Sequence, residues 1–373
     1  MKPRKSHLRH KPTRDGKKSA PMAAGYRMPA EWEPHAATWI AWPHNRSDWP
    51  GKFSPIPWVY AEIVRHLSSS ETVCVIVRDK EMQESAQRVL AKAEAVRGPV
   101  RFFIAPTNRT WTRDYGPTFV VRESDGNVAA VKWGFNGWAK YDNYLLDEKA
   151  GQQIVRWAKV PCLRPKRSDG TPIILEGGSI DVNGAGCLLT TRECLLSSVQ
   201  ERNPGFSQED YENVFRDYLG VRKTIWLNRG ILGDDTHGHV DDLARFVRPD
   251  TIVTVVEEDS TDPNFEPLRE NLRILRAATD ESGKKVRVVP LPLPQPVIFD
   301  GQRLPASYAN FYIANRVVLV PTFNDPNDRI ALDRLQRLFP DRKVVGICCV
   351  DLVLGLGTLH CLTQQQPAAT SAK

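Results

Sequence analysis

Hydrophobic positions along the chain fall into short strand-like runs, most of them paired around a turn. Runs at 118–122 and 128–133 flank the turn signal SDGN at 124–127, which predicts a β-hairpin. The pattern recurs roughly every 60 to 65 residues, which indicates repeated supersecondary units. Further hairpins are predicted for 173–182 with 187–191, 243–247 with 251–256, and 310–313 with 317–321.

Amphipathic stretches, which predict helices, separate these pairs. No linker rich in Pro, Gly or Ser interrupts residues 28–366. We therefore expect one α/β domain at 28–367, built of about five repeated ββαβ units, with a short tail at 368–373. Helices are predicted at 58–68, 80–95, 147–159, 208–219, 264–279 and 328–339, and additional strands at 36–42, 72–77, 100–104, 224–227, 286–291 and 343–348.

The formal net charge of +7 is concentrated at the N-terminus. Residues 1–27 hold nine Lys or Arg side chains and one acid, Asp15. This segment carries +8 and leaves −1 for the rest of the chain. A block of like charge without aromatic residues is typical of disorder, so we expect a basic, disordered tail at 1–27. A nucleic-acid contact stays open for that tail alone.

The cysteines indicate a reducing environment. They number seven, an odd count, and no CxxC pair occurs, which argues against a disulfide framework and a structural zinc site. No apolar segment resembles a signal peptide or a membrane span. We expect a cytoplasmic protein without a membrane partner, and a homo-oligomer stays open.

Four stretches concentrate polar residues beside glycine and strand-like runs. They are candidates for chemistry because such residues are costly to bury without a purpose. The stretches are WTRDYGP (111–117), LEGGS (175–179), GDDTHGHVDD (233–242) and GLGTLHCLTQ (355–364).

The third stretch allows two chemical interpretations. His237 and His239, followed by Asp241 and Asp242, suggest a metal site of the zinc-hydrolase kind, although the chain offers only His360 downstream as a further imidazole. Without metal, an extended 239–241 would project His239 and Asp241 from one face, where they could hold a cation and move a proton. A solvated loop with neither role stays open as well.

The fourth stretch supplies a candidate nucleophile, Cys361. Cys348 and Cys349 continue an apolar strand and suit core packing, whereas Cys361 lies between a glycine-rich approach and a polar run. His360 is adjacent, but consecutive side chains of an extended segment point to opposite faces. The activating base must then come from elsewhere, and His239 is the best candidate.

Carboxylates indicate the class of substrate. A site that joins Asp114, Asp241 and Glu176 would be strongly anionic and would require a cation, because uncompensated buried carboxylates are unfavourable. Two carboxylates around a planar fork of N–H donors match a guanidinium.

With these residues, the chain resembles the guanidine-modifying superfamily, and most closely the agmatine deiminases, which are grouped with bacterial peptidylarginine deiminases. The resemblance runs from Met28 to Pro367, and it implies a pentein-like, five-bladed pseudosymmetric α/β propeller and a hydrolase that needs no metal or cofactor. The motifs that carry it are MPAEWEPH (28–35), WTRDYGP (111–117), LEGGS (175–179), GHVDD (238–242), YANFYIAN (308–315), NDPNDR (324–329) and LHCLTQQQP (359–367).

The resemblance also implies roles for single residues. Cys361 would be the nucleophile of a covalent thiouronium mechanism and His239 the general acid and base. Asp114 and Asp241 would grip the guanidinium. Glu176 would help to bind the substrate, and Trp111 would wall the pocket. The implied reaction is deimination of agmatine to N-carbamoylputrescine and ammonia, a step of putrescine and polyamine biosynthesis.

Two positions depart from the family pattern. Arg109 stands where many agmatine deiminases have aspartate, and Thr358 ends what is otherwise a glycine-rich run. Arg109 could favour a substrate tail that carries a carboxylate. Arginine and peptidylarginine therefore stay open as substrates, and a zinc hydrolase or a non-catalytic binding module stays open outside the class.

Overall fold

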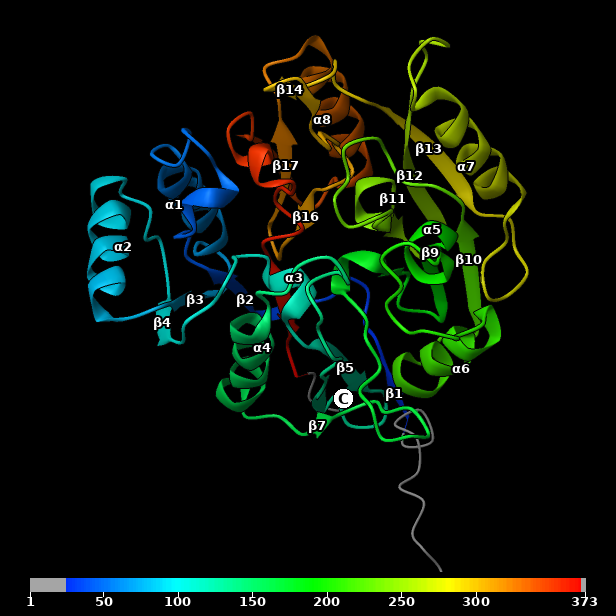
Figure 1. The fold of residues 1–373 in the computed structure, drawn as a ribbon, viewed down its shortest axis with the longest axis horizontal. Helices are drawn as coiled ribbons and strands as arrows, with labels where there is room; N and C mark the ends of the chain where they lie inside the picture. Colours follow the sequence, from blue (N-terminus) through cyan, green and yellow to red (C-terminus); the bar gives the residue numbers. More distant parts are fainter. Residues whose placement is uncertain (1–24, 370–373) are drawn as a thin grey trace, which may run out of the picture.

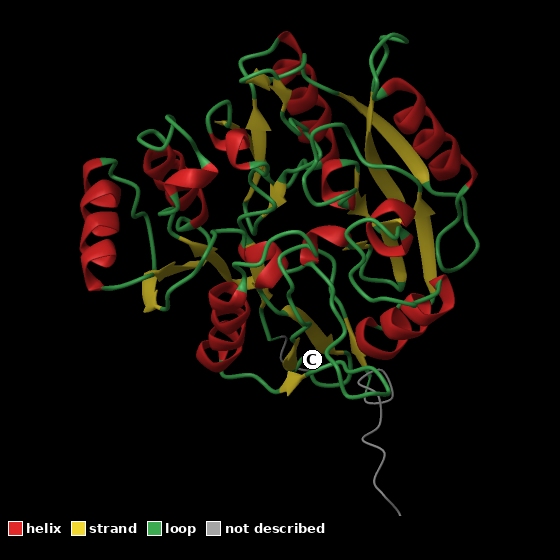
Figure 2. Cartoon of the chain, in the orientation of Figure 1, coloured by secondary structure: helices red, strands yellow, loops and turns green. Residues whose placement is uncertain are grey.

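The computed structural model describes residues 25–369 and has a mixed α/β architecture of several small sheets (Figure 1). Five of the sheets share one local plan within this range: two antiparallel neighbours are followed by a strand parallel to the second. At least one helix connects the second and third strands of each plan. The predicted alternation of hairpins and helices is confirmed. Figure 2 shows the longer helices toward the periphery and many loops toward the centre.

One sheet joins segments from both ends of the described chain. Its register places Gln364 opposite Trp39, so the segment that contains residue 361 is fixed against the N-terminal strands. The sheet has the order β19-β2-β3-β4, and its elements are β2 (His35–Ala41), α1 (Ile56–Leu67), β3 (Thr72–Val77), α2 (Lys80–Lys92), β4 (Val100–Ile104) and β19 (Gln364–Pro367).

The remaining elements form four further sheets and one separate hairpin, β14-β15. The strands are β1 (Tyr26–Arg27), β5 (Thr118–Arg122), β6 (Val128–Val131), β7 (Cys162–Leu163), β8 (Asp181–Val182), β9 (Cys187–Thr191), β10 (Lys223–Leu227), β11 (Ala244–Arg248), β12 (Thr251–Val256), β13 (Arg287–Pro292), β14 (Ile298–Phe299), β15 (Gln302–Arg303), β16 (Tyr312–Ile313), β17 (Val317–Thr322) and β18 (Lys343–Cys348). The helices are α3 (Thr112–Tyr115), α4 (Leu145–Ala158), α5 (Arg192–Leu196), α6 (Gln208–Leu219), α7 (Phe265–Ala277) and α8 (Pro326–Leu338).

Local sequence fixes the ends of the best-defined helices. Ser207 and Asp210 form a reciprocal capping box at the start of α6, and Gly220 ends that helix at a φ of 72°. Asp325 and Asp328 form the same box at the start of α8, directly before Pro326 at the first helical position. These caps satisfy backbone groups that the helix itself leaves unpaired.

Segment 173–182 is not the long strand that the sequence predicts. Residues Gly177–Ser179 form a 3-10 turn, and only β8 at its end pairs with β9. The turn forms because the backbone N–H and the hydroxyl of Ser179 both donate to the Glu176 carbonyl, at 3.2 and 2.6 Å. The expectation of a continuous strand here is wrong.

Segment 239–241 is also not extended. Val240–Asp242 forms a 3-10 turn closed by Leu243 N–H donating to the Val240 carbonyl at 2.9 Å. The alternation argument that placed His239 and Asp241 on one strand face is therefore wrong. The turn and its tertiary contacts bring the two side chains together instead, with His239 Nδ1 and Asp241 Oδ1 4.0 Å apart.

The N-terminal boundary lies slightly earlier than expected. Tyr26 and Arg27 were assigned to the basic tail, yet they pair with Arg122 and Val121 of β5. The rest of the expected tail at 1–24, and the end of the C-terminal tail at 370–373, lie outside the described residues.

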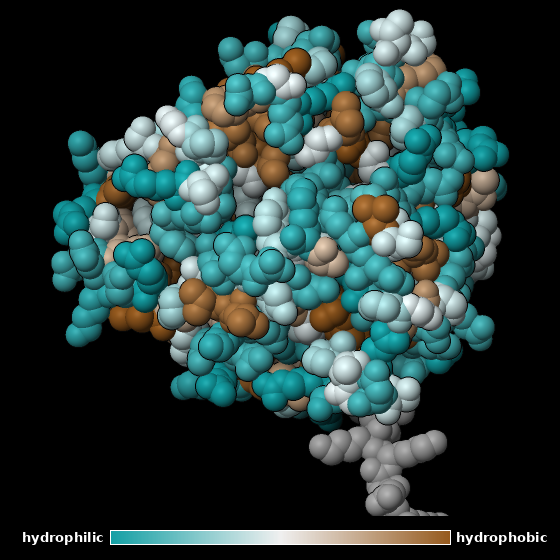
Figure 3. Space-filling model, in the orientation of Figure 1, coloured by the Kyte–Doolittle hydropathy of each residue, from teal (hydrophilic) through white to brown (hydrophobic). Residues whose placement is uncertain are grey.

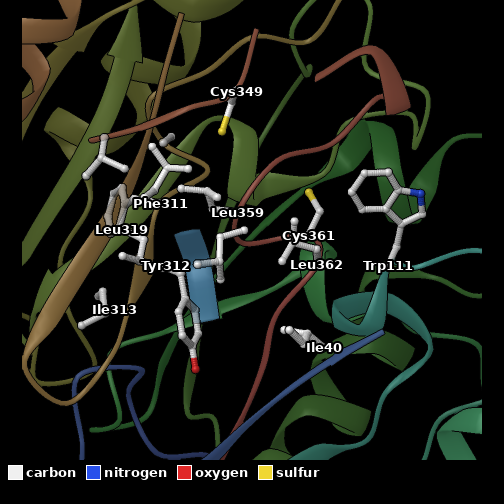
Figure 4. Close-up of a cluster of buried hydrophobic side chains, with 14 of the residues drawn as sticks. Ile40, Trp111, Phe311, Tyr312, Ile313, Leu319, Cys349, Leu359, Cys361 and Leu362 are labelled. Atoms are coloured by element: carbon white, nitrogen blue, oxygen red, sulfur yellow. The ribbon is translucent and has the colours of Figure 1, made fainter. Parts of the chain in front are cut away.

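Two clusters of buried hydrophobic side chains form the core, and Trp111 and Cys361 lie in the larger one. In Figure 4 these two side chains lie together, whereas Cys349 lies apart from them. Figure 3 shows a largely hydrophilic face on which hydrophobic groups are scattered. Between residues 25 and 369, no helix combines the length and hydrophobicity needed to cross a bilayer.

Candidate active site

All four polar stretches of the sequence meet at one place. α3 carries Asp114, the turn Gly177–Ser179 follows Glu176, and the turn Val240–Asp242 follows His239. The segment before β19 supplies Cys361, whose carbonyl accepts from Arg113 N–H at 3.2 Å. These side chains come from different sheets, so only the complete fold assembles them.

Asp114 is buried and firmly oriented. Its Oδ2 accepts from Trp138 Nε1 at 2.9 Å, and its Oδ1 accepts from Gly178 N–H at 3.0 Å. Burial raises the pKa of Asp114 to about 6; Asp241 and Glu176 act in the same direction, and His239 opposes them. Trp138 was missed from the sequence, because a single tryptophan in a loop gives no signal of a hydrogen bond to a carboxylate.

His239 lies among three carboxylates. Its Nδ1 is 3.9 Å from Asp114 Oδ1 and 4.0 Å from Asp241 Oδ1, and its Nε2 is 3.8 Å from Glu176 Oε2. Burial alone would lower the pKa of His239, but Asp114, Cys194 and Glu176 raise it well above the ordinary value. The ring is therefore an imidazolium that can give a proton.

Glu176 lies behind His239 and does not line the cavity. Arg202 Nε donates to Glu176 Oε1 at 3.1 Å, and both side chains are fully buried. Although burial opposes ionisation, Arg202 and His239 lower the pKa of Glu176 to about 2. Glu176 thus lies where its negative charge can stabilise the position and the positive charge of the His239 ring. Arg202 gave no signal in the sequence, since it lies in an irregular loop far from any motif.

Cys361 is buried beside two hydrogen-bonding groups. Asn310 Nδ2 donates to Cys361 Sγ at 3.0 Å, and the thiol points to Asp241 Oδ2 at 3.7 Å. Burial raises the pKa of the Cys361 thiol well above its ordinary value, and Asp241 and Asp242 raise it further. These surroundings favour the neutral thiol of Cys361 over the thiolate.

Asn310 ties the nucleophile segment together. Its Oδ1 accepts from Thr358 Oγ1 at 2.8 Å and from His360 N–H at 3.0 Å, while its Nδ2 reaches Cys361. The departure at Thr358 thus adds a hydrogen bond that supports Asn310. Asn310 belongs to the quoted YANFYIAN motif, which was the available signal for it.

A cavity of about 360 Å³ opens onto this cluster. Trp111, Asp114 and Cys361 line one part of it, and Trp111 packs against Trp49 with ring centroids 5.9 Å apart. Beyond Trp138, Asp48 and Arg109 line another part. This is the size and composition of a small-molecule site.

The histidines do not converge in the way a zinc hydrolase requires. Among residues 25–369, two buried groups contain enough donor atoms for a metal, and each has at most one imidazole. They are Glu176 with Cys194 and His239, and Asp241 with Asp242 and Cys361. His237 joins neither group and instead lies 3.1 Å from Ser197 Oγ. This donor set differs from the histidine-rich sets of catalytic zinc.

Comparisons with known proteins agree with the arrangement. A sequence model of the Porphyromonas-type peptidyl-arginine deiminases matches residues 27–367. An agmatine deiminase of Pseudomonas aeruginosa is 37% identical, with 95% of this chain and 99% of the relative covered. The solved agmatine deiminase of Enterococcus faecalis superposes with a TM-score of 0.86 at 33% identity, over 95% of this chain and 99% of that one. That of C. jejuni superposes with a TM-score of 0.79 at 29% identity, over 93% and 97%. The chain thus belongs to the Porphyromonas-type peptidyl-arginine deiminase family.

Proposed function

We propose that this protein is an agmatine deiminase, a hydrolase that converts agmatine and water to N-carbamoylputrescine and ammonia. The observation that carries the proposal is the convergence of Cys361, His239, Asp114 and Asp241 in one buried, anionic cluster beside a small cavity. The relatives named above support agmatine as the substrate. The product is a precursor of putrescine, which places the enzyme in polyamine biosynthesis.

Asp114 and Asp241 hold the substrate guanidinium. Asp241 Oδ1 is buried and has no hydrogen-bond partner among the described residues, so it has an acceptor free for a substrate N–H. Paired carboxylates fix a guanidinium in one plane, with its carbon presented to the sulfur. Trp111 walls the pocket beside Cys361.

The first half of the reaction depends on how the bound guanidinium changes the net charge around Cys361. A bound guanidinium neutralises Asp114 and Asp241, which lowers the pKa of the Cys361 thiol and releases its proton to solvent. The thiolate then attacks the guanidinium carbon. His239, already an imidazolium, protonates the departing amine as the carbon–nitrogen bond breaks, which leaves a thiouronium on Cys361.

The second half restores the enzyme. Neutral His239 takes a proton from water, and the hydroxide adds to the thiouronium carbon. Collapse of this adduct breaks the carbon–sulfur bond, and its hydroxyl proton passes to the leaving sulfur, which releases N-carbamoylputrescine and restores the Cys361 thiol and the His239 imidazolium. Glu176, fixed by Arg202, contributes to substrate binding through His239, whose charge and position it maintains.

Ammonia release from agmatine, arginine and a blocked peptidylarginine, measured in parallel, tests the proposal. We expect agmatine to have the highest kcat/KM. A higher kcat/KM with arginine or peptidylarginine would identify that compound, and not agmatine, as the preferred substrate of this deiminase. No ammonia release from any of the three compounds would indicate a non-catalytic role. Ammonia release that requires added zinc would contradict the cysteine mechanism.

The far part of the cavity favours a cationic tail. Arg109 is already engaged there: its Nη1 donates to the carbonyl and Oδ1 of Asn143, and its guanidinium lies 4.2 Å from the centroid of Tyr141. Asp48 Oδ2, by contrast, is buried without a hydrogen-bond partner among the described residues. The charged group with an acceptor still free in this part of the cavity is thus the carboxylate of Asp48. A free carboxylate supports binding of the amine of agmatine over binding of the carboxylate of arginine.

We expect Asp48→Asn to raise the KM for agmatine about tenfold and to leave kcat nearly unchanged, because it removes one partly buried charge pair. The KM for arginine should not rise. Asp300→Asn is the matched control, since Asp300 lines the same cavity but is exposed, and it should change either KM less than about twofold. An equal rise for both substrates would contradict the assignment.

Gly178→Ala should reduce kcat/KM by at least about 100-fold while the protein still folds. A Cβ at this position would lie 2.5 Å from His239 Nδ1 and 3.0 Å from Asp114 Oδ1, so both catalytic side chains would have to move. Gly205→Ala serves as a control for the substitution, because its site has open space around the added carbon, even though it carries the strain of a positive φ that Gly178 does not have. A kcat/KM of Gly178→Ala close to that of the wild type would mean that activity does not depend on the present positions of the His239 and Asp114 side chains.

The raised pKa of Asp114 predicts the acid limb of the pH profile. Only the ionised carboxylate binds a guanidinium, and with a pKa of about 6 that form is lost as the pH falls through 6. We expect kcat/KM for agmatine to fall about tenfold for each pH unit below that point. A profile that stays flat down to about pH 5 would show that Asp114 ionises at its ordinary pKa.

The same proposal covers the organisation of the chain. Five sheets with one plan, with β19 closing onto β2, support a pentein-like five-bladed pseudosymmetric propeller over residues 28–367. All seven cysteines are free thiols, which supports a cytoplasmic location.

A further inference from the structure

His360 lies between two carboxylates, and it approaches the same oxygen of Asp241 that faces the sulfur of Cys361. Its Nδ1 is 2.7 Å from Asp241 Oδ2, and its Nε2 is 2.8 Å from Glu31 Oε2. All three side chains are buried. An ionised carboxylate only accepts hydrogen bonds, so each ring nitrogen must carry a proton. The ring satisfies both neighbours only as an imidazolium.

Both neighbours are held in the ionised state. Arg245 Nη2 donates to Glu31 Oε2 at 2.8 Å, and Ile313 N–H donates to Glu31 Oε1 at 2.6 Å. Although burial opposes ionisation, Arg245 and His360 hold the pKa of Glu31 well below its usual range. Burial likewise opposes ionisation of Asp241, and the hydrogen bond from His360 lowers its pKa.

The contact determines which oxygen of Asp241 is available. His360 occupies Oδ2, which also faces the Cys361 thiol at 3.7 Å. Oδ1 is left without a partner among the described residues and faces His239 Nδ1 at 4.0 Å. A turn of the carboxylate away from this orientation would leave the Nδ1–H of the buried imidazolium without an acceptor, which is unfavourable.

His360 does not act as the base for its neighbour Cys361. Both of its ring nitrogens are engaged by carboxylates, and its backbone N–H donates to Asn310 Oδ1 at 3.0 Å. The ring has no free nitrogen to receive the thiol proton. The position of His360 next to Cys361 in the sequence therefore serves a role other than proton transfer from the thiol.

We propose that His360, held as an imidazolium by Glu31, is a positioning residue that fixes Asp241 so that Oδ1 faces the substrate guanidinium. This inference rests on the proposed function for the identity of that substrate. It extends the site to Glu31 in the N-terminal segment, through connected contacts from Cys361 to Asp241, His360 and Glu31.

Kinetics of two matched variants test the proposal. His360→Gln should lower kcat/KM for agmatine about 100-fold, with KM raised at least about tenfold, because the carboxylate loses its fixed orientation. His35→Gln is the control: His35 is equally buried and lies 3.4 Å from Glu71 Oε1 and 2.7 Å from the Glu31 carbonyl, but it does not touch Asp241. It should retain kcat and KM within about threefold.

Thermal unfolding of both variants separates stability from positioning. Equal kinetic losses in the two variants, tracking equal losses of stability, would show that His360 is only structural and would overturn the proposal. A rise in KM in His360→Gln alone, without an equal rise in His35→Gln, would support it.

A spectroscopic measurement keeps the inference testable if His360→Gln does not fold. In the substrate-free protein labelled with ¹⁵N-histidine, both ring nitrogens of His360 should carry a proton, since each faces a carboxylate oxygen, and Glu31→Gln should return the ring to one proton. A singly protonated ring in the unmodified protein would overturn the proposal. Because no substrate is present, this result is independent of wild-type turnover of agmatine, which tests the proposed function by itself.

Discussion

Cys361→Ala will lower ammonia release from agmatine by at least about 10⁴-fold, because it removes the atom that forms the covalent intermediate. The remaining side chains can still bind the guanidinium, so the variant should retain affinity for agmatine. Rate measurements together with mass spectrometry of the quenched enzyme check this: the wild type should show a substrate-derived adduct on Cys361 and the variant none.

Cys348→Ala is the matched control for the nucleophile. Cys348 is exposed at the end of β18, outside the cluster, and its removal should leave kcat/KM within about twofold. Retention of more than about one per cent of activity in Cys361→Ala would rule out a covalent route through this sulfur.

Asp114→Asn should reduce kcat/KM by about 10³-fold, which corresponds to about 4 kcal/mol of transition-state binding. The amide has the shape of the carboxylate, and its oxygen can still accept from Trp138 Nε1. What is lost is the negative charge that pairs with the guanidinium, together with the acceptor that Gly178 N–H uses. Steady-state kinetics with agmatine, compared with thermal unfolding, show whether the loss is one of chemistry or of folding.

Asp242→Asn tests whether activity depends on the charge of a carboxylate or only on the shape of the side chains in the same buried cluster. Burial raises the pKa of Asp242 well above its ordinary value, and Asp241 raises it further, so this carboxyl is already neutral. An amide reproduces the protonated acid, and kcat/KM should stay within about threefold. Similar losses in Asp114→Asn and Asp242→Asn would mean that the cluster responds to any change of side chain, and not to the charge of Asp114.

Much of the fold was predictable because hydrophobic periodicity reports burial. Strands β3, β4, β5, β12 and β18 and helix α6 have the predicted bounds, since each is an uninterrupted apolar or amphipathic run between clear turn or capping residues. The short strands β7 and β19 were not predicted: each is made by pairing with a distant partner, and the polar residues of β19 have no strand-like pattern of their own.

The identity of the clustered residues was predictable, but their geometry was not. Costly polar residues beside glycine indicated Asp114, His239 and Cys361, yet the turns that carry them form through contacts made only in the folded chain. Trp138 and Arg202 follow no local pattern, because each acts by reaching a carboxylate that is remote in sequence.

The pairing of β19 with β2 sets the order in which the enzyme becomes active during folding. It joins residue 364 to residue 39, a contact between distant segments whose loop-closure entropy must be paid before the pairing stabilises the fold. Cys361 directly precedes β19, so the sulfur reaches its carboxylates only when this pairing closes. Before that point the thiol is exposed and ionises at its ordinary pKa, whereas burial in the native state suppresses the thiolate. Vulnerability of the nucleophile to oxidation is therefore greatest in the unfinished chain, and completion of the fold protects it.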